Sequence, residues 1–500
     1  MIETRRHVFW HRTEVQTAIE RLAQTESVPV LTGAGASAKA GFPLWPSLVA
    51  DLLSRALVSD PRLKGNDSSR VELARRITAE GPIAAASYAH VLLGDRFDHV
   101  LADAVYASVA SPANAGATAV AAAMLCMSLG PSSELATLNY DNQLSLAFDH
   151  IGVRTAKVMT TARAKRPGEV LIRHLHGHVS PKSVAESIVL TEADYYGKPS
   201  RPTQWNEKFM SQRLKDSSFL FVGTSLTDPN LLRYLHSQRR PLPARKHFAI
   251  FTVPADISVV ASDAYETAAA RKWHEVGVDP LHNDMYGQTA QFLHEIRLAR
   301  ELKDAYVPYS DRLDQWATSM KSWLYDFSEP SFSKSQTLIQ SRLQDAVDTL
   351  LELLDGNGVR LGRDERLSIE IWSRLVEERS LLMLGSSRLR WAVSTDSMPS
   401  TPIVPGNEHP VMDSFMRGSR MVADLPGPER PWRSVLALPI TLQDHPQFAR
   451  LPVGVLTVCS SLPLQDSVLS RLRLEVPDAD EVLAGRDGIG TGLLDPAAPG

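Results

Sequence analysis

The sequence has very few cysteines and no strong excess of charge. Among its 500 residues the only cysteines are Cys126 and Cys459. We therefore expect neither a disulfide framework nor a four-cysteine zinc module within one chain. Its 53 basic and 57 acidic residues leave a net charge of −4. This balance provides no basic excess of the kind that makes nucleic acid the expected partner.

Long apolar runs are also missing. The most apolar stretch, residues 117–129 (ATAVAAAMLCMSL), is shorter than the roughly 20 residues that span a bilayer. Because it is rich in alanine, it predicts a buried helix. The first residues, MIETRRHVFW, carry charge where a signal peptide has an apolar core. We expect a cytoplasmic protein with no membrane partner.

The length and composition indicate a globular protein of more than one domain. Its 43% hydrophobic and 22% charged residues are ordinary values for folded proteins, and 500 residues exceed one typical domain. We expect a first domain over residues 1–300, a helical connector over 301–355 and a second domain over 356–474. The remaining residues, 475–500, are acidic and rich in Gly and Pro, which predicts a disordered tail.

Short apolar runs alternate with helical patterns in the first domain. The runs predict strands at residues 28–32, 135–139, 171–176, 187–190, 219–223 and 248–253. The helical patterns cover residues 13–22, 83–93, 206–214, 230–237 and 262–274. This alternation predicts an α/β, doubly wound (Rossmann-like) domain with a parallel sheet covered on both faces.

The second half of the chain predicts a smaller α+β domain. Residues 337–354 form an amphipathic helix, which is either that domain's own first helix or a dimer helix. The apolar stripe of this helix contains Ile339, Leu343, Ala346, Leu350 and Leu354. Beyond it we expect a helix at 367–381 and strands at 388–393, 434–440 and 453–459.

A glycine-rich segment, residues 32–38 (TGAGASA), follows the first predicted strand. Gly33 and Gly35 permit a tight turn and a close approach of the backbone to a pyrophosphate, and with Ala38 they fit a relaxed dinucleotide fingerprint. The N–H groups that follow would bind phosphate. The alternative is a glycine turn with a purely structural role.

Two polar residues, Asn139 and Asp141, follow the second predicted strand. In α/β proteins such positions face the crevice where ligands bind. An amide and a carboxylate there suit a ribose hydroxyl or a water molecule. The alternative is that they form a turn or cap a helix.

Three histidines at alternate positions, His174, His176 and His178, would share one face of a strand. Three imidazoles on one face suit zinc. The alternative, which we prefer because Gly177 suggests that the strand ends there, is a single catalytic His176. Histidine is a natural general base near neutral pH.

A fourth segment, residues 222–230 (VGTSLTDPN), again places a small-residue loop after an apolar strand. Thr224 and Ser225 offer hydroxyl groups to a ribose or a phosphate. Asp228, followed by Pro229, has the pattern of a helix N-cap, and we expect this capping role.

Together, these segments resemble the sirtuin-like domain, and specifically the bacterial sirtuin-like NAD hydrolases of anti-phage defence. Sirtuins carry GAG-A/I-S, T-x-N-x-D, H-G and G-T-S motifs in this order. The matching positions are 33–37, 137–141, 176–177 and 223–225. GFPLW at 41–45 resembles the G-x-P-x-W variant of the defence branch, and so do Leu190-Thr191 and Asp194-Tyr195. The resemblance covers residues 15–298.

The departures from the family pattern are informative. Deacylases of this family have an aspartate where this chain has Leu44, and they carry a four-cysteine zinc module that two cysteines cannot supply. The resemblance therefore leaves NAD cleavage as the expected activity and puts protein deacylation in doubt. We expect NAD⁺ as a substrate, no prosthetic group and no zinc.

The resemblance also implies residue roles. Asn139 and Asp141 would contact the nicotinamide ribose and position water, and His176 would bond a ribose hydroxyl or act as general base. The remaining NAD-binding residues would be Gly33, Ala34, Gly35 and Ser37 at the diphosphate, Gly223, Thr224 and Ser225 at the adenosine half, and Thr137. The expected products are nicotinamide and linear or cyclic ADP-ribose.

The second domain resembles a GAF-type sensor. Residues 433–440 and 453–458 look like its central antiparallel strands, with an excursion over 394–431 covering a ligand pocket; a scaffold without ligand is the alternative. The resemblance implies an effector of abortive infection, controlled by this domain. We expect a homo-oligomer and a small-molecule or phage-derived trigger.

Two other functions stay open. One is a nucleotide-sensing module without turnover. The other is a Rossmann dehydrogenase, which needs an acidic ribose partner about 20 residues beyond the glycines. Asp51 is the nearest acidic residue, and that reading gives no role to Asn139 and His176 as a pair.

Overall fold

The computed structural model divides the chain into two compact units. The first comprises Met1–Val253 and Ser258–Tyr306, and the second comprises Pro254–Ile257 and Val307–Gly500. The residues that the structure describes are 9–109, 115–130, 134–159, 166–180, 183–196, 201–237, 247–252, 259–283, 286–314, 331–374, 380–388, 399–402, 409–417, 420–425, 431–442 and 451–472.

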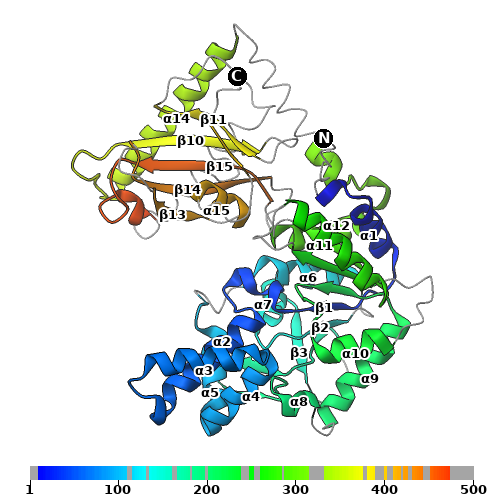
Figure 1. Cartoon of the computed structure of the whole chain (residues 1–500). Coiled ribbons are helices and arrows are strands. Elements are labelled where there is room, and N and C mark those ends of the chain that lie inside the picture. The colour runs from blue at the N-terminus through cyan, green and yellow to red at the C-terminus, as the bar shows by residue number, and fades with distance from the viewer. Residues whose placement is uncertain are drawn as a thin grey trace. The chain divides into compact units, whose positions relative to one another are not determined.

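The first unit is built on a seven-stranded sheet in the order β3-β4-β2-β1-β7-β8-β9 (Figure 1). All its neighbouring strands run parallel, so the predicted parallel-sheet α/β fold is confirmed. The strands are β1 (Val30–Thr32), β2 (Leu135–Thr137), β3 (Arg154–Val158), β4 (Glu169–His174), β7 (Leu220–Val222), β8 (His247–Thr252) and β9 (Val278–Asn283). The strands that follow β1 in the chain, β2 to β4, lie on one side of it in the sheet, and β7 to β9 lie on the other side. The topological switch point therefore lies between β1 and β7, where α/β sheets bind ligands.

Helices cover this sheet. Apolar residues of α9, α10 and α11 share a buried cluster with sheet residues such as Leu31, Phe221 and Ala249. Among the other helices, α1 and α6 each pack against α12. These helices, with α7, are α1 (Thr13–Gln24), α6 (Ala117–Ser128), α7 (Gln143–His150), α9 (Arg201–Asp216), α10 (Pro229–Ser237), α11 (Val259–His274) and α12 (Tyr286–Leu302). The alanine-rich run lies in α6 and is buried, as predicted.

Along the chain, a module of four helices lies between β1 and β2, which are themselves neighbours in the sheet. The module is drawn in blue in Figure 1. It consists of α2 (Trp45–Ser59), α3 (Asp67–Ala79), α4 (Pro82–Leu93) and α5 (Phe97–Tyr106). Its apolar core includes Val179 and Leu190 from the segment after β4. That segment forms a hairpin of β5 (His178–Ser180) and β6 (Ser183–Glu186), followed by the short α8 (Glu192–Tyr196).

The second unit contains a six-stranded antiparallel sheet in the order β12-β11-β10-β15-β14-β13. Its strands are β10 (Leu367–Arg374), β11 (Ser380–Ser386), β12 (Ser400–Pro402), β13 (Met421–Asp424), β14 (Ser434–Leu442) and β15 (Leu451–Ser460). Two helices, α14 (Ser331–Gly356) and α15 (Pro410–Arg417), pack on this sheet. The strands predicted at 434–440 and 453–459 are β14 and β15, and they pair antiparallel.

The amphipathic stripe of α14 is the unit's own core face. Ile339, Leu343 and Leu350 are buried in one cluster with β10, β14 and β15. Gly385 in β11 makes room for this helix, because a Cβ atom there would lie 2.3 Å from Ile339 Cγ2. Of the two alternatives for this stripe, the domain's own helix is therefore the one observed.

Three predicted elements either differ from the structure or lie outside the residues that it describes. The helix expected at 367–381 is wrong: residues 367–374 form β10, because Leu367, Ile369 and Ile371 alternate into the core with a period of two. No strand forms at 187–190, and β6 ends at Glu186. The strand expected at 388–393 lies mostly outside the described residues, and β11 ends at Ser386.

The sequence patterns also missed β3 and β9, the two edge strands of the parallel sheet. The predicted tail, 475–500, and much of the excursion at 394–431 lie outside the described residues. Across the described part of the chain, no helix combines the length and apolarity required to cross a bilayer.

Candidate functional site

A cavity of about 660 Å³ opens at the carboxyl ends of the central strands, a volume within the usual range for small-molecule sites. Most of the residues predicted for the site lie on its wall. These are Gly33, Ala34, Gly35, Asn139, Asp141, His176, Gly223, Thr224 and Ser225. Ser37 and Thr137 are not among the lining residues; both are buried.

The two glycine loops that follow β1 and β7 pack directly against each other. Gly33 N–H donates to Val222 O at 2.9 Å, and Gly35 N–H donates to Gly223 O at 2.7 Å. A Cβ atom on Gly35 would lie 2.9 Å from Gly223 O, and one on Gly223 would lie 2.2 Å from Ala36 N. Gly223 also has a φ of +63°. The glycines therefore serve a structural turn and the cavity wall together.

Asn139 is fixed by two hydrogen bonds that its amide donates. Asn139 Nδ2 donates to Gly33 O and to Ser37 Oγ, each at 3.0 Å. Because Gly33 O can only accept, this assigns the amide nitrogen, and the carbonyl oxygen Oδ1 is left buried without a hydrogen-bond partner. A buried acceptor without a partner carries a desolvation cost, so the orientation of Asn139 is maintained by the two bonds that its amide nitrogen donates.

Asp141 is a buried carboxyl group that also stabilises the turn before α7. Its Oδ1 accepts from Gln143 N–H at 2.9 Å, at the start of α7. Burial raises the pKa of this carboxyl above its ordinary value, while hydrogen bonds from Gln143 N–H and the side chains of Ser37 and Asn139 act in the opposite direction. The turn alternative for Asp141 is thus observed, since its carboxylate accepts from the N–H two residues on, and the residue also lines the cavity.

The side chains of Thr137 and of the loop after β7 mainly accept hydrogen bonds from nearby backbone N–H groups. Thr137 Oγ1 accepts from Asn139 N–H at 3.0 Å, which helps to fix the turn that carries Asn139. Thr224 Oγ1 accepts from Leu226 N–H at 3.2 Å, and the hydroxyls of Ser225 and Thr227 are 2.6 Å apart. Leu226 is fully buried with a φ of +54°, an uncommon conformation for a non-glycine residue.

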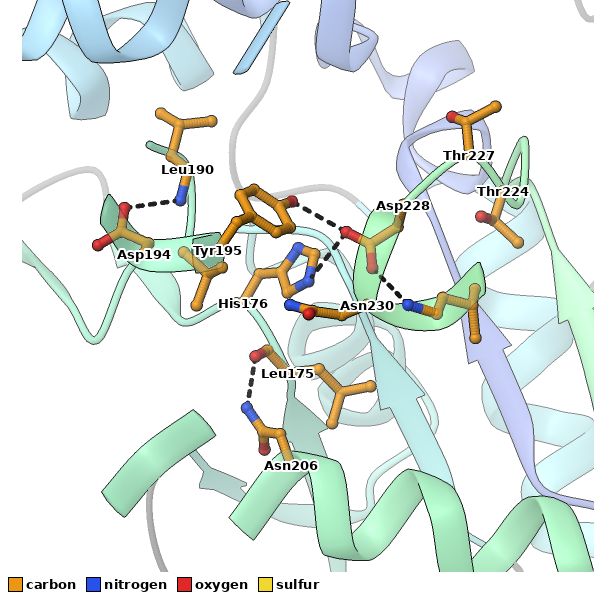
Figure 2. A network of polar contacts seen from close by, with 12 residues as sticks. Leu175, His176, Leu190, Asp194, Tyr195, Asn206, Thr224, Thr227, Asp228 and Asn230 are labelled. Carbon is orange, nitrogen blue, oxygen red and sulfur yellow. Dashed lines mark hydrogen bonds and ion pairs between the residues drawn. The ribbon is translucent and has the colours of Figure 1, made fainter. Parts of the chain in front are cut away.

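His176 lies in the turn after β4 and contacts the carboxylate of Asp228, with His176 Nε2 3.3 Å from Asp228 Oδ2 (Figure 2). Tyr195 in α8 donates its hydroxyl to the same oxygen at 2.9 Å. Burial, followed by the charge of Asp228, raises the pKa of the Tyr195 phenol well above its ordinary value. Asp228 Oδ1 accepts from Leu231 N–H at 2.8 Å, so the predicted N-cap of α10 is observed too.

Sequence reasoning missed Asp228 and Tyr195 as cavity residues, although both line it beside His176. The pattern Asp-Pro after a strand indicates the start of a helix, but the Asp228 carboxylate both caps that helix and lines the cavity.

The far part of the cavity wall was also missed. It includes Thr252 at the end of β8 and, from α11, Tyr265, Lys272 and Trp273. The Lys272 ammonium lies 4.2 Å from the centre of the Trp273 ring.

The other two histidines of the triplet do not join His176. His174 and His178 contact each other edge to face, with ring centres 4.9 Å apart, and Lys157 Nζ lies 2.9 Å from His178 Nε2. Burial lowers the pKa of His174 to about 3 and that of His178 to about 4. Within the described residues no group of three metal-ligating side chains comes together. The triplet therefore divides into a buried pair and one cavity residue.

Comparison with known proteins identifies a similarity over part of the first unit. A family model of the SIR2-like domain matches residues 133–281. The match begins just before β2 and ends in β9, so it contains Asn139, His176 and Gly223 but not the loop at Gly33. No curated protein matches the chain.

Solved structures of Sir2 homologues are also similar to the chain. A Sir2 homologue in complex with NAD is 14% identical, with 57% of this chain and 94% of that chain covered and a TM-score of 0.29. A mutant Sir2 homologue in complex with ADP-ribose is 16% identical, with coverage of 58% and 98% and a TM-score of 0.33. The family match over residues 133–281 makes this part of the unit sirtuin-like.

Proposed function

We propose that the first unit cleaves the bond between nicotinamide and ribose in NAD⁺ and transfers the ADP-ribosyl group to water. The products are nicotinamide and ADP-ribose, or a cyclic form when an atom of the adenine replaces water as the acceptor. The observation that carries this proposal is the convergence of Asn139 and His176 on one cavity with the two glycine loops. The sirtuin-like match over residues 133–281 supports NAD as the ligand.

The site residues fit the chemistry of this cleavage. As the bond to nicotinamide breaks, the electron pair leaves with nicotinamide and the ribose gains oxocarbenium character. Fixed polar groups stabilise such a state best where water is excluded. Asn139 is held in place by Gly33 and Ser37 and lines the cavity, so its side chain is suited to contact a ribose hydroxyl or the attacking water. His176 is suited to accept the proton that this water releases.

The dehydrogenase alternative receives no support from the geometry. Asp51, its required ribose partner, lies within α2 and pairs with Arg55 four residues on, at 2.9 Å. It is not among the residues that line the cavity. A sensor without turnover remains the second candidate, because the same cavity would hold a nucleotide whether or not the bond breaks.

A single experiment separates these functions. The full chain is incubated with NAD⁺, and the products are identified by chromatography and mass spectrometry. Release of nicotinamide with linear or cyclic ADP-ribose supports the proposal. Binding of NAD⁺ without any product would instead indicate a sensor, and formation of NADH with an added substrate would indicate a dehydrogenase.

We further propose that the cleavage is the effector step of abortive infection and that the second unit controls it. This role rests on the resemblance to defence proteins, as do the GAF-like nature of the second unit, a homo-oligomeric state and a small-molecule or phage-derived trigger. No zinc is expected to be needed, and elemental analysis showing one zinc per chain would contradict that expectation. Cells that carry the protein should lose NAD⁺ after phage infection, and cells with His176→Ala should not.

A further inference from the structure

The structure contains one carboxylate that joins three elements around the proposed base. Asp228 Oδ1 accepts from Leu231 N–H in α10, while Oδ2 faces both the Tyr195 hydroxyl of α8 and His176 Nε2. The side chains of Asp228 and His176 are each only 10% exposed. The three side chains point toward one another in Figure 2.

This arrangement favours one position for the proton of the His176 ring. An ionised carboxylate only accepts hydrogen bonds, so it stabilises a proton on the ring nitrogen that faces it, Nε2. In a neutral imidazole the other nitrogen, Nδ1, is then an acceptor. Among the described residues no group bonds Nδ1, and the ring lines the cavity. The acceptor nitrogen is thus left available for a proton from a ligand or water.

We propose that Asp228 is a positioning residue that holds His176 in the Nε2–H tautomer and thereby makes Nδ1 the base of the reaction. The inference rests on the function proposed above and deepens it. The separation of 3.3 Å is long for a hydrogen bond, as is common for catalytic contacts before the substrate is bound. The N-cap contact and the Tyr195 hydroxyl fix the carboxylate, so that the imidazole is oriented against a rigid group.

The decisive variant is Asp228→Asn, because asparagine is as good an N-cap as aspartate. Its side-chain oxygen can keep the bond from Leu231 N–H, which leaves the NH₂ group facing His176. Nε2 must then accept, and the ring proton moves to Nδ1, so that the base is lost. We expect kcat for NAD⁺ cleavage to fall by about 10²-fold or more, with KM for NAD⁺ changed less than about threefold.

The chain offers a matched control in Asp60. Asp60 also precedes a proline, accepts from a backbone N–H (Arg62, 2.9 Å) at the start of a short helix, and is not among the cavity-lining residues. Asp60→Asn makes the same chemical change away from His176 and should leave kcat within about twofold. If Asp228→Asn retains more than a third of the wild-type kcat, the positioning role is overturned.

A spectroscopic measurement tests the proposal independently of turnover and of the stability of any variant. In full-length protein with ¹⁵N-labelled histidine, the His176 signals are assigned by comparison with His176→Gln. The expected pattern is the Nε2–H tautomer in the wild type and the Nδ1–H tautomer in Asp228→Asn. An Nδ1–H tautomer in the wild type would overturn the inference. If the wild type shows Nε2–H but releases no nicotinamide from NAD⁺, the proposed function fails while the tautomer assignment stands.

Discussion

At the scale of single residues, the polar groups of the site also stabilise the fold. Asp228 caps α10, Asp141 stabilises the turn before α7, and both line the cavity. Asn139 connects its own strand end to the loop at Gly33. Buried polar groups need hydrogen-bond partners, so a site built from them is stabilised by the contacts that also orient it. Substitutions here must therefore be tested for stability and activity together.

Replacing Asn139 or His176 by alanine should nearly abolish NAD⁺ cleavage. Loss of a positioned base or polar stabiliser typically costs about 10²- to 10⁴-fold in rate. His178→Ala should have a much milder effect on turnover, because His178 contacts Lys157 and His174 instead of Asp228. Nicotinamide release measured beside thermal melting gives the result, and near-full turnover of His176→Ala would contradict the assignment.

Buried histidines should make the first unit sensitive to acid. Burial lowers the pKa of His174 to about 3, and that of His178 and of His247 to about 4, against an ordinary value of 6.5. The unfolded chain therefore binds more protons than the folded chain below pH 6.5. Stability is complete above that pH and is lost as the pH falls toward 4, by about 2 kcal/mol for each histidine at pH 5.

Denaturant unfolding between pH 7 and pH 4.5 measures this loss. His247→Asn removes one of the three buried histidines. The unfolding free energy of this variant should therefore fall less steeply with decreasing pH, by the contribution of one histidine. His99→Gln, at an exposed position, serves as the control and should leave the dependence as in the wild type. Equal slopes for both variants would show that the buried His247 is not responsible.

At the scale of elements, the packing of two loops decides the shape of the cavity. The loops after β1 and β7 approach so closely that glycine is required on both. Since β1 and β7 flank the switch point of the sheet, this approach forms the floor on which a dinucleotide would lie. The same closeness makes the loops sensitive to a single methyl group.

Gly223→Ala should separate these loops and lower NAD⁺ cleavage by more than tenfold. Its Cβ would meet backbone atoms of Ala36, which cannot swing aside as the end of a side chain can. Gly65 provides the control: its φ of +76° is similarly left-handed, but nothing lies within 4 Å of an added Cβ. Gly65→Ala should cost only the backbone strain, about 1 kcal/mol, with unchanged turnover. Equal activity of the two variants would contradict the loop-packing argument.

At the scale of the whole molecule, two compact units share one chain. An NAD⁺ hydrolase that is always active would deplete its own cell, so we expect a resting state controlled by the second unit. The core of that unit includes α14. A truncation after residue 355 would therefore leave the apolar stripe of α14 exposed, and the boundary at Tyr306 gives the sharper test.

The fragment 1–306 should differ from the full chain in NAD⁺ turnover by at least tenfold, in one direction. Coupling free energies of 1–3 kcal/mol are typical for regulated proteins, and tenfold falls within that range. Turnover is compared at equal active-site concentration, with circular dichroism and thermal melting to show that the fragment is folded. Identical kinetics of a folded fragment and the full chain would rule out control by the second unit.

The parallel-sheet class and the order of the polar segments could be predicted from local patterns in the sequence. Strand–helix alternation is a local pattern, and strands that end in glycine or Asx residues mark the ligand edge of such a sheet. The positions of residues 33–35 and 139 at this edge were therefore predictable, and the structure places them, together with His176, among the residues that line the cavity. The capping pattern of Asp228 was equally local and is observed.

Features that depend on contacts between distant segments could not be predicted in this way and are seen only in the folded molecule. Leu367, Ile369 and Ile371 alternate with a period of two, and this segment forms a strand because β10 pairs with β11 on one side and β15 on the other. The contact between His176 and Asp228 joins residues from separate strand ends, and their separation along the chain gives no sign of it. The histidine triplet divided because its strand ends at His174. Gly177 already indicates in the sequence that the strand ends near this point, but the contact of His178 with Lys157 depends on the tertiary structure.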